Sequence, residues 1–196
     1  MNQELEIEFK NLLMKNEFET IRNFFNLSES SFIVQENHYF DTEDFSLKEN
    51  SSALRIRLKE NNHILTLKQP QQVGLLETHQ SLTSQSVKQL IEGKSVIDGK
   101  ISELISEMGI QHELLKYFGT LKTYRSEVPY KNGILVLDHS LYLNVEDFEL
   151  EYEVTDEIEG FENFKNLLTS LNIPQRKTEN KIQRFYNKLY YHGDHK

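Results

Sequence analysis

Glutamates recur at every second position in two separate segments of the chain, residues 4–10 (ELEIEFK) and residues 148–154 (FELEYEV). Successive side chains of a β-strand point to opposite faces, and residues two apart share a face about 6.5–7 Å apart. In both segments the positions between the glutamates are apolar. Each segment therefore predicts a strand with one acidic face and one apolar face.

Basic side chains follow the same rule in residues 54–59 (LRIRLK), 64–68 (ILTLK) and 121–125 (LKTYR). Arg55 and Arg57 share a strand face, Lys68 adds a cation on the next strand, and Arg125 adds one further along the chain. A single Glu-x-Glu or Arg-x-Arg is more often a solvated strand face. Two acidic strands together with a set of basic strands, each sorted by sign, favour a functional arrangement.

The sorted charges would meet if the strands rolled into a closed barrel with the apolar faces outward under helices. Two carboxylates about 7 Å apart repel by roughly 0.6 kcal/mol in water, and more strongly where the dielectric is lower. Enclosed carboxylates would then require a divalent cation, and oxygen ligands select Mg²⁺ or Mn²⁺ over zinc or copper. Enclosed cations would require a polyanion, and the arginine fork matches phosphate oxygens. A phosphate chain with its bound metal satisfies both requirements.

The remaining pattern is rich in strands, with helices at both ends and one helical insertion, and it predicts an α+β, mainly antiparallel β fold. Strands are expected at residues 4–10, 37–42, 52–59, 64–69, 75–81, 118–130, 134–138 and 148–155, with residues 142–143 extending the strand at 134–138. Helices are expected at residues 11–27, 84–92, 100–108, 159–171 and 176–189. Turns are expected at residues 61–62 and 131–133.

Composition excludes several classes of protein. The 196 residues carry 22 Lys and Arg against 31 Asp and Glu, a net charge of −9 that argues against a general nucleic-acid binder. There is no cysteine, hence no disulfide or thiolate zinc site. The seven histidines are scattered without HExxH spacing, and P-loop, GxGxxG and GxSxG motifs are missing. No signal peptide or membrane-spanning run is recognisable, so we expect a cytoplasmic protein without membrane or nucleic-acid partners.

Residues 6–10 (EIEFK) match the ExExK signature of the CYTH family, also called triphosphate tunnel metalloenzymes. Further segments resemble family elements in the right order and cover nearly the whole chain. They are residues 38–42 (HYFDT), 53–57 (ALRIR), 65–68 (LTLK), Arg125, residues 137–138 (LD), 148–151 (FELE) and 180–185 (NKIQRF). The last of these is similar to the family's late S-K-x-x-R-F element, with Asn180 where the family often has serine.

The resemblance implies one domain over residues 1–196: a closed eight-stranded antiparallel barrel, or tunnel, with a charged interior and flanking helices. It implies a catalytic group of Glu6, Glu8 and Lys10. It implies metal binding by Glu6, Glu8, Asp138, Glu149 and Glu151. It implies phosphate binding by Arg55, Arg57, Lys68, Arg125, Lys181 and Arg184. Glu4 and Glu153 extend the acidic faces as rim residues, and Glu77 faces either the tunnel or solvent.

The resemblance further implies a hydrolase that uses Mg²⁺ or Mn²⁺ to cleave the terminal phosphoanhydride of a triphosphate. We expect a monomer or homodimer. Inorganic triphosphate is the preferred small-molecule substrate, because the polar faces are committed to phosphate and metal and none forms a recognisable base pocket. The alternatives are a class IV-type adenylyl cyclase, a thiamine triphosphatase, and a non-catalytic polyphosphate- or nucleotide-binding protein. Incubation with ATP would distinguish a cyclase, which forms cyclic AMP, from a triphosphatase, which releases phosphate. Tight binding without turnover would indicate a non-catalytic binding protein.

Overall fold

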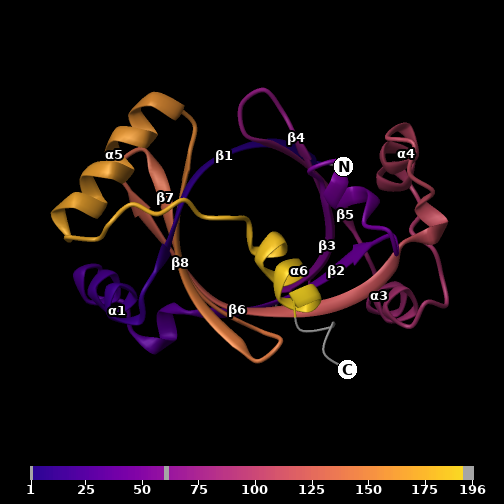
Figure 1. Ribbon diagram of the computed structural model, residues 1–196, viewed down its shortest axis with the longest axis horizontal. Coiled ribbons are helices and arrows are strands. Elements are labelled where there is room, and N and C mark those ends of the chain that lie inside the picture. Colours follow the sequence, from indigo (N-terminus) through magenta and orange to yellow (C-terminus); the bar gives the residue numbers. More distant parts are fainter. Residues whose placement is uncertain (1, 60–61, 192–196) are drawn as a thin grey trace. The chain divides into compact units, whose positions relative to one another are not determined.

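The computed structural model describes residues 2–59 and 62–191 (Figure 1). Its strands are β1 (Asn2–Leu13), β2 (Ile33–Asp41), β3 (Ala53–Lys59), β4 (Asn62–Pro70), β5 (Leu75–Ser81), β6 (Lys116–Tyr130), β7 (Gly133–Tyr142) and β8 (Val145–Val154). They form a closed barrel in the order β1-β5-β4-β3-β2-β6-β7-β8. The predicted fold class, a closed eight-stranded barrel flanked by helices, is confirmed.

The helices are α1 (Lys15–Phe24), α2 (Ser46–Glu49), α3 (Ser84–Ile91), α4 (Lys100–Glu107), α5 (Glu157–Ser170) and α6 (Lys181–Tyr191), with 3₁₀ turns at Glu29–Ser31 and His112–Leu114. No helix within the described ranges is long and apolar enough to cross a membrane. The chain divides into two compact units. Unit one comprises the residues through Leu5 together with Gln35–Leu121, and unit two comprises Glu6–Val34 and the chain from Lys122 onward.

In unit one, the apolar face of β3 and β4 packs against α3 and α4. Leu54 and Ile56 of β3 lie in one buried cluster with Val87 of α3 and with Ile101 and Ile105 of α4. Because side chains alternate along a strand, the residue between Leu54 and Ile56 points to the opposite face of β3, as do the alternate residues before and after it. That face carries the basic residues of β3 and β4.

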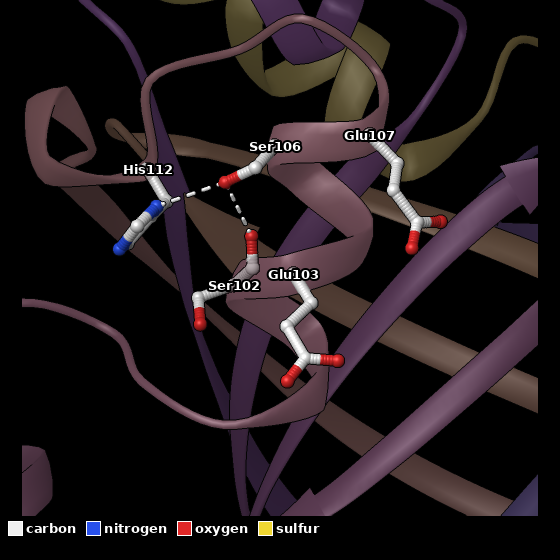
Figure 2. Close-up of a pocket in the computed structure, with 5 residues that line it drawn as sticks. All are labelled: Ser102, Glu103, Ser106, Glu107 and His112. Atoms are coloured by element: carbon white, nitrogen blue, oxygen red, sulfur yellow. Dashed lines mark hydrogen bonds between the residues drawn. The ribbon is translucent and has the colours of Figure 1, made fainter.

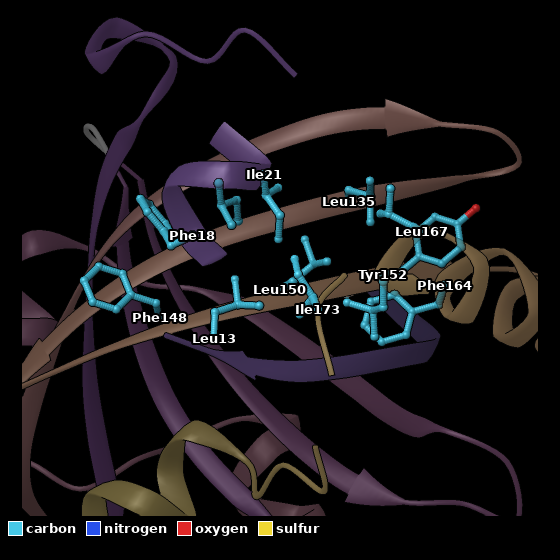
Figure 3. Packing of buried hydrophobic residues seen from close by; sticks show 12 residues of the cluster. Leu13, Phe18, Ile21, Leu135, Phe148, Leu150, Tyr152, Phe164, Leu167 and Ile173 are labelled. Atoms are coloured by element: carbon cyan, nitrogen blue, oxygen red, sulfur yellow. The ribbon is translucent and has the colours of Figure 1, made fainter. Parts of the chain in front are cut away.

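In unit two, β7 and β8 pack against α1 and α5, as Figure 3 shows. Leu150 and Tyr152 of β8 lie in this cluster with Ile21 of α1 and Phe164 of α5. Gly160 lets α5 come close to the sheet, since a Cβ there would lie 2.6 Å from Val154 Cγ2. The alternate residues of β7 and β8 therefore face away from α1 and α5.

Two predicted helix boundaries are wrong. Residues 11–13 belong to β1, and α1 begins at Lys15, because β1 continues to pair with β8 as far as Leu13 opposite Phe148. The side chain of Asn11 is fully buried; its amide donates to the Pro174 carbonyl at 3.1 Å. The helix predicted from residue 176 begins at Lys181, and Thr178 instead accepts a hydrogen bond from the Leu12 amide.

The other predicted elements are confirmed, with shifts at their ends. β2 begins at Ile33, before the expected residue 37, and β7 runs without a break to Tyr142, in line with the expected extension of the strand at residues 134–138. Of the turn predicted at residues 61–62, residue 61 lies outside the described residues, and Asn62 opens β4. The expected turn at residues 131–133 connects β6 to β7, and Lys131 there has a positive φ of 48°.

Candidate active site

Carboxylates gather on the face of unit two that points away from α1 and α5. Strand register places Asp138 of β7 directly opposite both Arg125 of β6 and Glu149 of β8, and it places Glu151 opposite Lys10 of β1. The side chains of Asp138 and Glu149 are 0% exposed, so neither carboxylate is solvated. Three residues that the sequence predicted as metal ligands thus lie together on neighbouring strands.

Arg125 binds two of these carboxylates. Its Nε donates to Asp138 Oδ1 at 2.9 Å, and its Nη2 donates to Asp138 Oδ2 at 2.7 Å and to Glu151 Oε2 at 2.9 Å. Glu153 lies further out, with Oε1 4.0 Å from Nη1. The fork geometry fixes both the position and the orientation of the Asp138 carboxylate.

Helix α6, yellow in Figure 1, brings two further cations to the same face. Lys181 Nζ lies 2.9 Å from Asp138 Oδ2, 2.8 Å from Glu149 Oε2 and 2.5 Å from Glu151 Oε1. Arg184 Nη2 donates to Glu149 Oε2 at 2.7 Å, and its Nε donates to Asp147 Oδ2 at 3.0 Å. Asp147 was not among the predicted site residues. The even spacing of acidic residues in β8 could have indicated it.

The first motif adds another ion pair to unit two. Lys10 is paired with Glu8, and Lys10 Nζ also donates to Asn180 Oδ1 at 2.8 Å. Asn180 is therefore bound to the lysine of the first motif. Glu6 lies two residues before Glu8, on the same face of β1.

Neighbouring cations hold two of the buried carboxylates, Asp138 and Glu151, ionised. Burial opposes ionisation of Asp138, but Arg125 and Lys181 outweigh it and keep the pKa of this carboxyl below its ordinary value. Burial likewise opposes ionisation of Glu151, and Lys181 and Arg125 hold its pKa well below the usual range. Conversely, the surrounding carboxylates overcome burial and raise the pKa of Lys181 well above its ordinary value. Asp138, Glu151 and Lys181 are therefore charged near neutral pH.

The residues present fit a divalent cation. The ion pairs named above join six carboxylates with four cations, which leaves a formal charge of −2 on these groups. Glu149 Oε1 is buried and has no hydrogen-bond partner within residues 2–59 and 62–191. An unpartnered carboxylate oxygen in a buried site is costly unless a ligand occupies it. Oxygen-only donors favour Mg²⁺ or Mn²⁺.

The predicted cations of unit one lie on the face of β3 and β4 that points away from α3 and α4. Arg55 lies opposite Thr66 in the strand register, and Arg57 Nε donates to Asn37 Oδ1 at 3.1 Å. Lys68 is paired with Glu77 of β5. Glu77 is buried on this charged face, which decides between the two orientations that the sequence allowed.

A second group of possible metal ligands, which the sequence did not predict, also lies in unit one. The ligand atoms of Glu4, Glu77 and His79 all lie within 4.8 Å of one another. His79 Nε2 is 3.2 Å from Glu4 Oε1, and its Nδ1 is 3.0 Å from Thr66 Oγ1. The sequence signal was the spacing of Glu77 and His79, which lie two residues apart in one predicted strand and so share a face.

An open pocket of about 530 Å³ lies beside α4 (Figure 2). Its lining residues are Ser102, Glu103, Ser106, Glu107 and His112. Ser106 Oγ donates to the Ser102 carbonyl at 2.9 Å and lies 3.1 Å from His112 Nδ1 (Figure 2). None of the predicted site residues lies in this pocket, and Ser106 makes the ordinary backbone bond of a helical serine.

The family model described as "CYTH domain" matches residues 4–186. The chain belongs to the CYTH family. This CYTH protein is 49% identical over 186 residues to the "Putative triphosphatase YjbK" of Bacillus subtilis (strain 168), covering 95% of this chain and 96% of the relative. The predicted family membership is confirmed.

Solved structures agree with the fold of this CYTH protein. A protein described as a putative adenylate cyclase (bh2851) from Bacillus halodurans is 45% identical, with a TM-score of 0.90 over 95% of this chain and 100% of that one. The "Putative adenylyl cyclase HpAC1" from Hippeastrum, described as having a dominant triphosphatase activity, is 22% identical, with a TM-score of 0.76 over 93% and 96% of the two chains. At that identity, the Hippeastrum protein supports the fold alone.

Proposed function

We propose that this CYTH protein is a divalent-metal-dependent triphosphatase that hydrolyses the terminal phosphoanhydride of a triphosphate, with inorganic triphosphate as the preferred substrate. The Bacillus subtilis relative, which matches almost the whole length of both chains, carries a triphosphatase name. The observation that carries the proposal is the buried, unpartnered Oε1 of Glu149 among ionised carboxylates, since it offers an oxygen ligand to a cation.

The residues proposed to hold Mg²⁺ or Mn²⁺ are Glu6, Glu8, Asp138, Glu149 and Glu151. A divalent cation bound there would polarise phosphoryl oxygens and lower the pKa of a bound water. Lys10, paired with Glu8 and bonded to Asn180, holds the Glu8 carboxylate in place. We assign Lys10 to the catalytic group on this contact.

The residues proposed to bind the phosphates are Arg55, Arg57, Lys68, Arg125, Lys181 and Arg184. Guanidinium forks and lysine ammonium groups neutralise phosphate oxygens and stabilise the charge that develops on the leaving oxygen. Lys181 lies within 2.9 Å of three carboxylates, so it is already desolvated and would exchange these partners for a phosphate oxygen. Sharing one lysine between carboxylate and phosphate keeps its charge compensated throughout.

A phosphate-release panel tests the proposal. Inorganic triphosphate, thiamine triphosphate, ATP and pyrophosphate are each incubated with Mg²⁺ and with Mn²⁺, and the expected result is the highest kcat/KM for inorganic triphosphate. Glu8→Gln should abolish metal-dependent turnover without unfolding the protein, whereas Arg57→Ala should mainly raise KM. Glu103→Gln, an exposed change on α4, is the matched control and should leave both parameters unchanged. Equal activity of Glu8→Gln and wild type at saturating metal would refute the metal assignment.

One observation favours a second candidate, because the Bacillus halodurans protein at 45% identity is described as a putative adenylate cyclase. A class IV-type cyclase would convert ATP to cyclic AMP and pyrophosphate. Chromatography of the ATP reaction distinguishes the two activities, since a triphosphatase releases phosphate and forms no cyclic AMP. Tight triphosphate binding without any product would instead indicate a non-catalytic binding protein.

Three coarser expectations remain proposals. We propose that residues 1–196 act as one domain, that the protein is cytoplasmic, and that it is a monomer or homodimer. Light scattering of the purified chain measures its mass in solution, and cell fractionation tests the location. The choice between Mg²⁺ and Mn²⁺ follows from the same activity panel.

A further inference from the structure

Tyr142, the last residue of β7, begins a chain of hydrogen bonds that ends at Glu149. Its hydroxyl donates to Asp147 Oδ2 at 2.8 Å. The same oxygen accepts from Arg184 Nε at 3.0 Å, and Arg184 Nη2 donates to Glu149 Oε2 at 2.7 Å. Tyr142 is 8% exposed, and every link of this chain lies within unit two.

These hydrogen bonds fix the orientation of the Glu149 carboxylate. Its Oε2 is bound by both Arg184 and Lys181, whereas its Oε1 has no hydrogen-bond partner within the described part of the chain. Two cations on one oxygen leave the other oxygen as the available ligand. The orientation therefore depends on where Arg184 is held, and Asp147 holds it.

Tyr142 in turn positions Asp147. Burial and the adjacent Asp147 raise the pKa of the Tyr142 hydroxyl, so it remains a hydrogen-bond donor at all physiological pH. The Tyr142 ring also lies 5.7 Å from the ring of Phe185 in α6, next to Arg184 in sequence. Tyr142 thus contacts the strand residue that binds Arg184 and the helix that carries it.

We propose that Tyr142 is a positioning residue that acts through Asp147 and Arg184 to present Glu149 Oε1 to a divalent cation. The inference rests on the metal assignment of the proposed function. Groups that orient metal ligands through hydrogen bonds typically change metal affinity by about 10–100-fold when they are removed. Tyr142 never touches the cation itself, so its loss weakens binding without removing a ligand.

The test is calorimetric titration of the full chain with Mn²⁺, without triphosphate, for wild type and Tyr142→Phe. The variant is expected to bind Mn²⁺ about 10-fold more weakly. In turnover assays, the Mn²⁺ concentration for half-maximal rate should rise by a similar factor, whereas kcat at saturating Mn²⁺ should change much less. Urea unfolding of both proteins measures the structural cost.

Tyr152→Phe is the matched control. Tyr152 is buried in the core cluster of unit two, and its hydroxyl donates to the Tyr130 carbonyl at 3.0 Å, away from the charged face. This variant also loses one buried tyrosine hydroxyl, so it should lose stability while its Mn²⁺ affinity stays at the wild-type value. A merely structural role of Tyr142 would make the two variants behave alike.

Two further variants keep the proposal falsifiable if Tyr142→Phe unfolds. Asp147→Asn should weaken Mn²⁺ binding as Tyr142→Phe does. In an Arg184→Lys background, which keeps the charge but removes the fork, adding Tyr142→Phe should have little further effect on Mn²⁺ affinity. If Tyr142→Phe or Asp147→Asn bound Mn²⁺ with wild-type affinity, this inference would be overturned and the proposed function would stand. Failure of wild type to bind Mn²⁺ and to hydrolyse triphosphate would overturn the proposed function as well.

Discussion

Replacement of Arg125 by methionine tests the ionised network of unit two most directly. The Arg125 side chain is 10% exposed and compensates two buried carboxylates, Asp138 and Glu151. Methionine fills a similar volume without charge or hydrogen-bond donors. Asp138, which is 0% exposed, would keep only Lys181 as a charged partner at 2.9 Å among the ion pairs described above.

Removal of one partner from a buried ion pair costs about 3–5 kcal/mol, because the other charge stays buried. Lys181 still compensates Asp138, so we place Arg125→Met near the lower end, at about 3 kcal/mol. In a domain of this size, each kcal/mol lowers Tm by about 2–4 °C, which predicts a drop of roughly 6–12 °C. Arg125→Lys keeps the charge but loses the fork, and its loss should be intermediate.

Urea unfolding followed by circular dichroism, repeated across a pH series, provides the assay. In wild type, Arg125 holds the pKa of Asp138 below its ordinary value and that of Glu151 well below it. In Arg125→Met these carboxyls would take up protons in the folded state at higher pH, so the penalty should shrink as the pH falls. A loss below about 1 kcal/mol near neutral pH, within the range of an exposed ion pair, would refute the reasoning. A loss that does not vary with pH would refute it too.

Three other predictions concern the same unit. The free energy of unfolding of wild type should fall as the pH drops below 4.5, the ordinary value for Glu151, because the unfolded chain binds protons first; a flat urea midpoint in this range would contradict it. Gly160→Ala should lower the free energy of unfolding by about 1–3 kcal/mol despite alanine's helix preference, because the new Cβ would lie 2.6 Å from Val154 Cγ2. Asn166→Ala, on the exposed face of α5, is the control and should not destabilise the fold. Urea unfolding of both variants measures the difference. Lys181→Met should tighten calorimetric Mn²⁺ binding in the absence of triphosphate and raise KM for triphosphate, and weaker Mn²⁺ binding would contradict the shared-carboxylate argument.

Strand alternation carried most of what the sequence could predict. Arg55 and Arg57 lie on one face of β3 and Leu54 and Ile56 on the other, as the period of two requires. The same rule placed Glu149 and Glu151 on the charged face of β8. Residue types alone were enough to predict which face of a strand each side chain occupies, because the apolar side chains of a strand must be buried and the alternate side chains then lie on the opposite face.

Long-range contacts account for what the sequence pattern missed. Asn11 continues β1 because its side chain forms hydrogen bonds with the backbone at residues 174 and 176. The local hydrophobic pattern does not indicate contacts that distant in the sequence. The helical pattern after residue 176 begins late for the same reason, since Arg176 is held in a two-bond contact with Glu17 of α1. Tyr142 and Asp147 are linked to Glu149 through Arg184, whose place depends on how α6 packs.

The network would allow the proposed metal site to be buried before any metal binds. Removal of several carboxylates from water costs several kcal/mol for each ion unless charges compensate it. Lys181 and Arg125 provide that compensation and hold the pKa of Glu151 well below its ordinary value, so this carboxylate is already ionised near neutral pH. Binding of a cation there would displace an ammonium group rather than a proton. Metal affinity should therefore vary little with pH near neutrality and depend strongly on the charge at position 181.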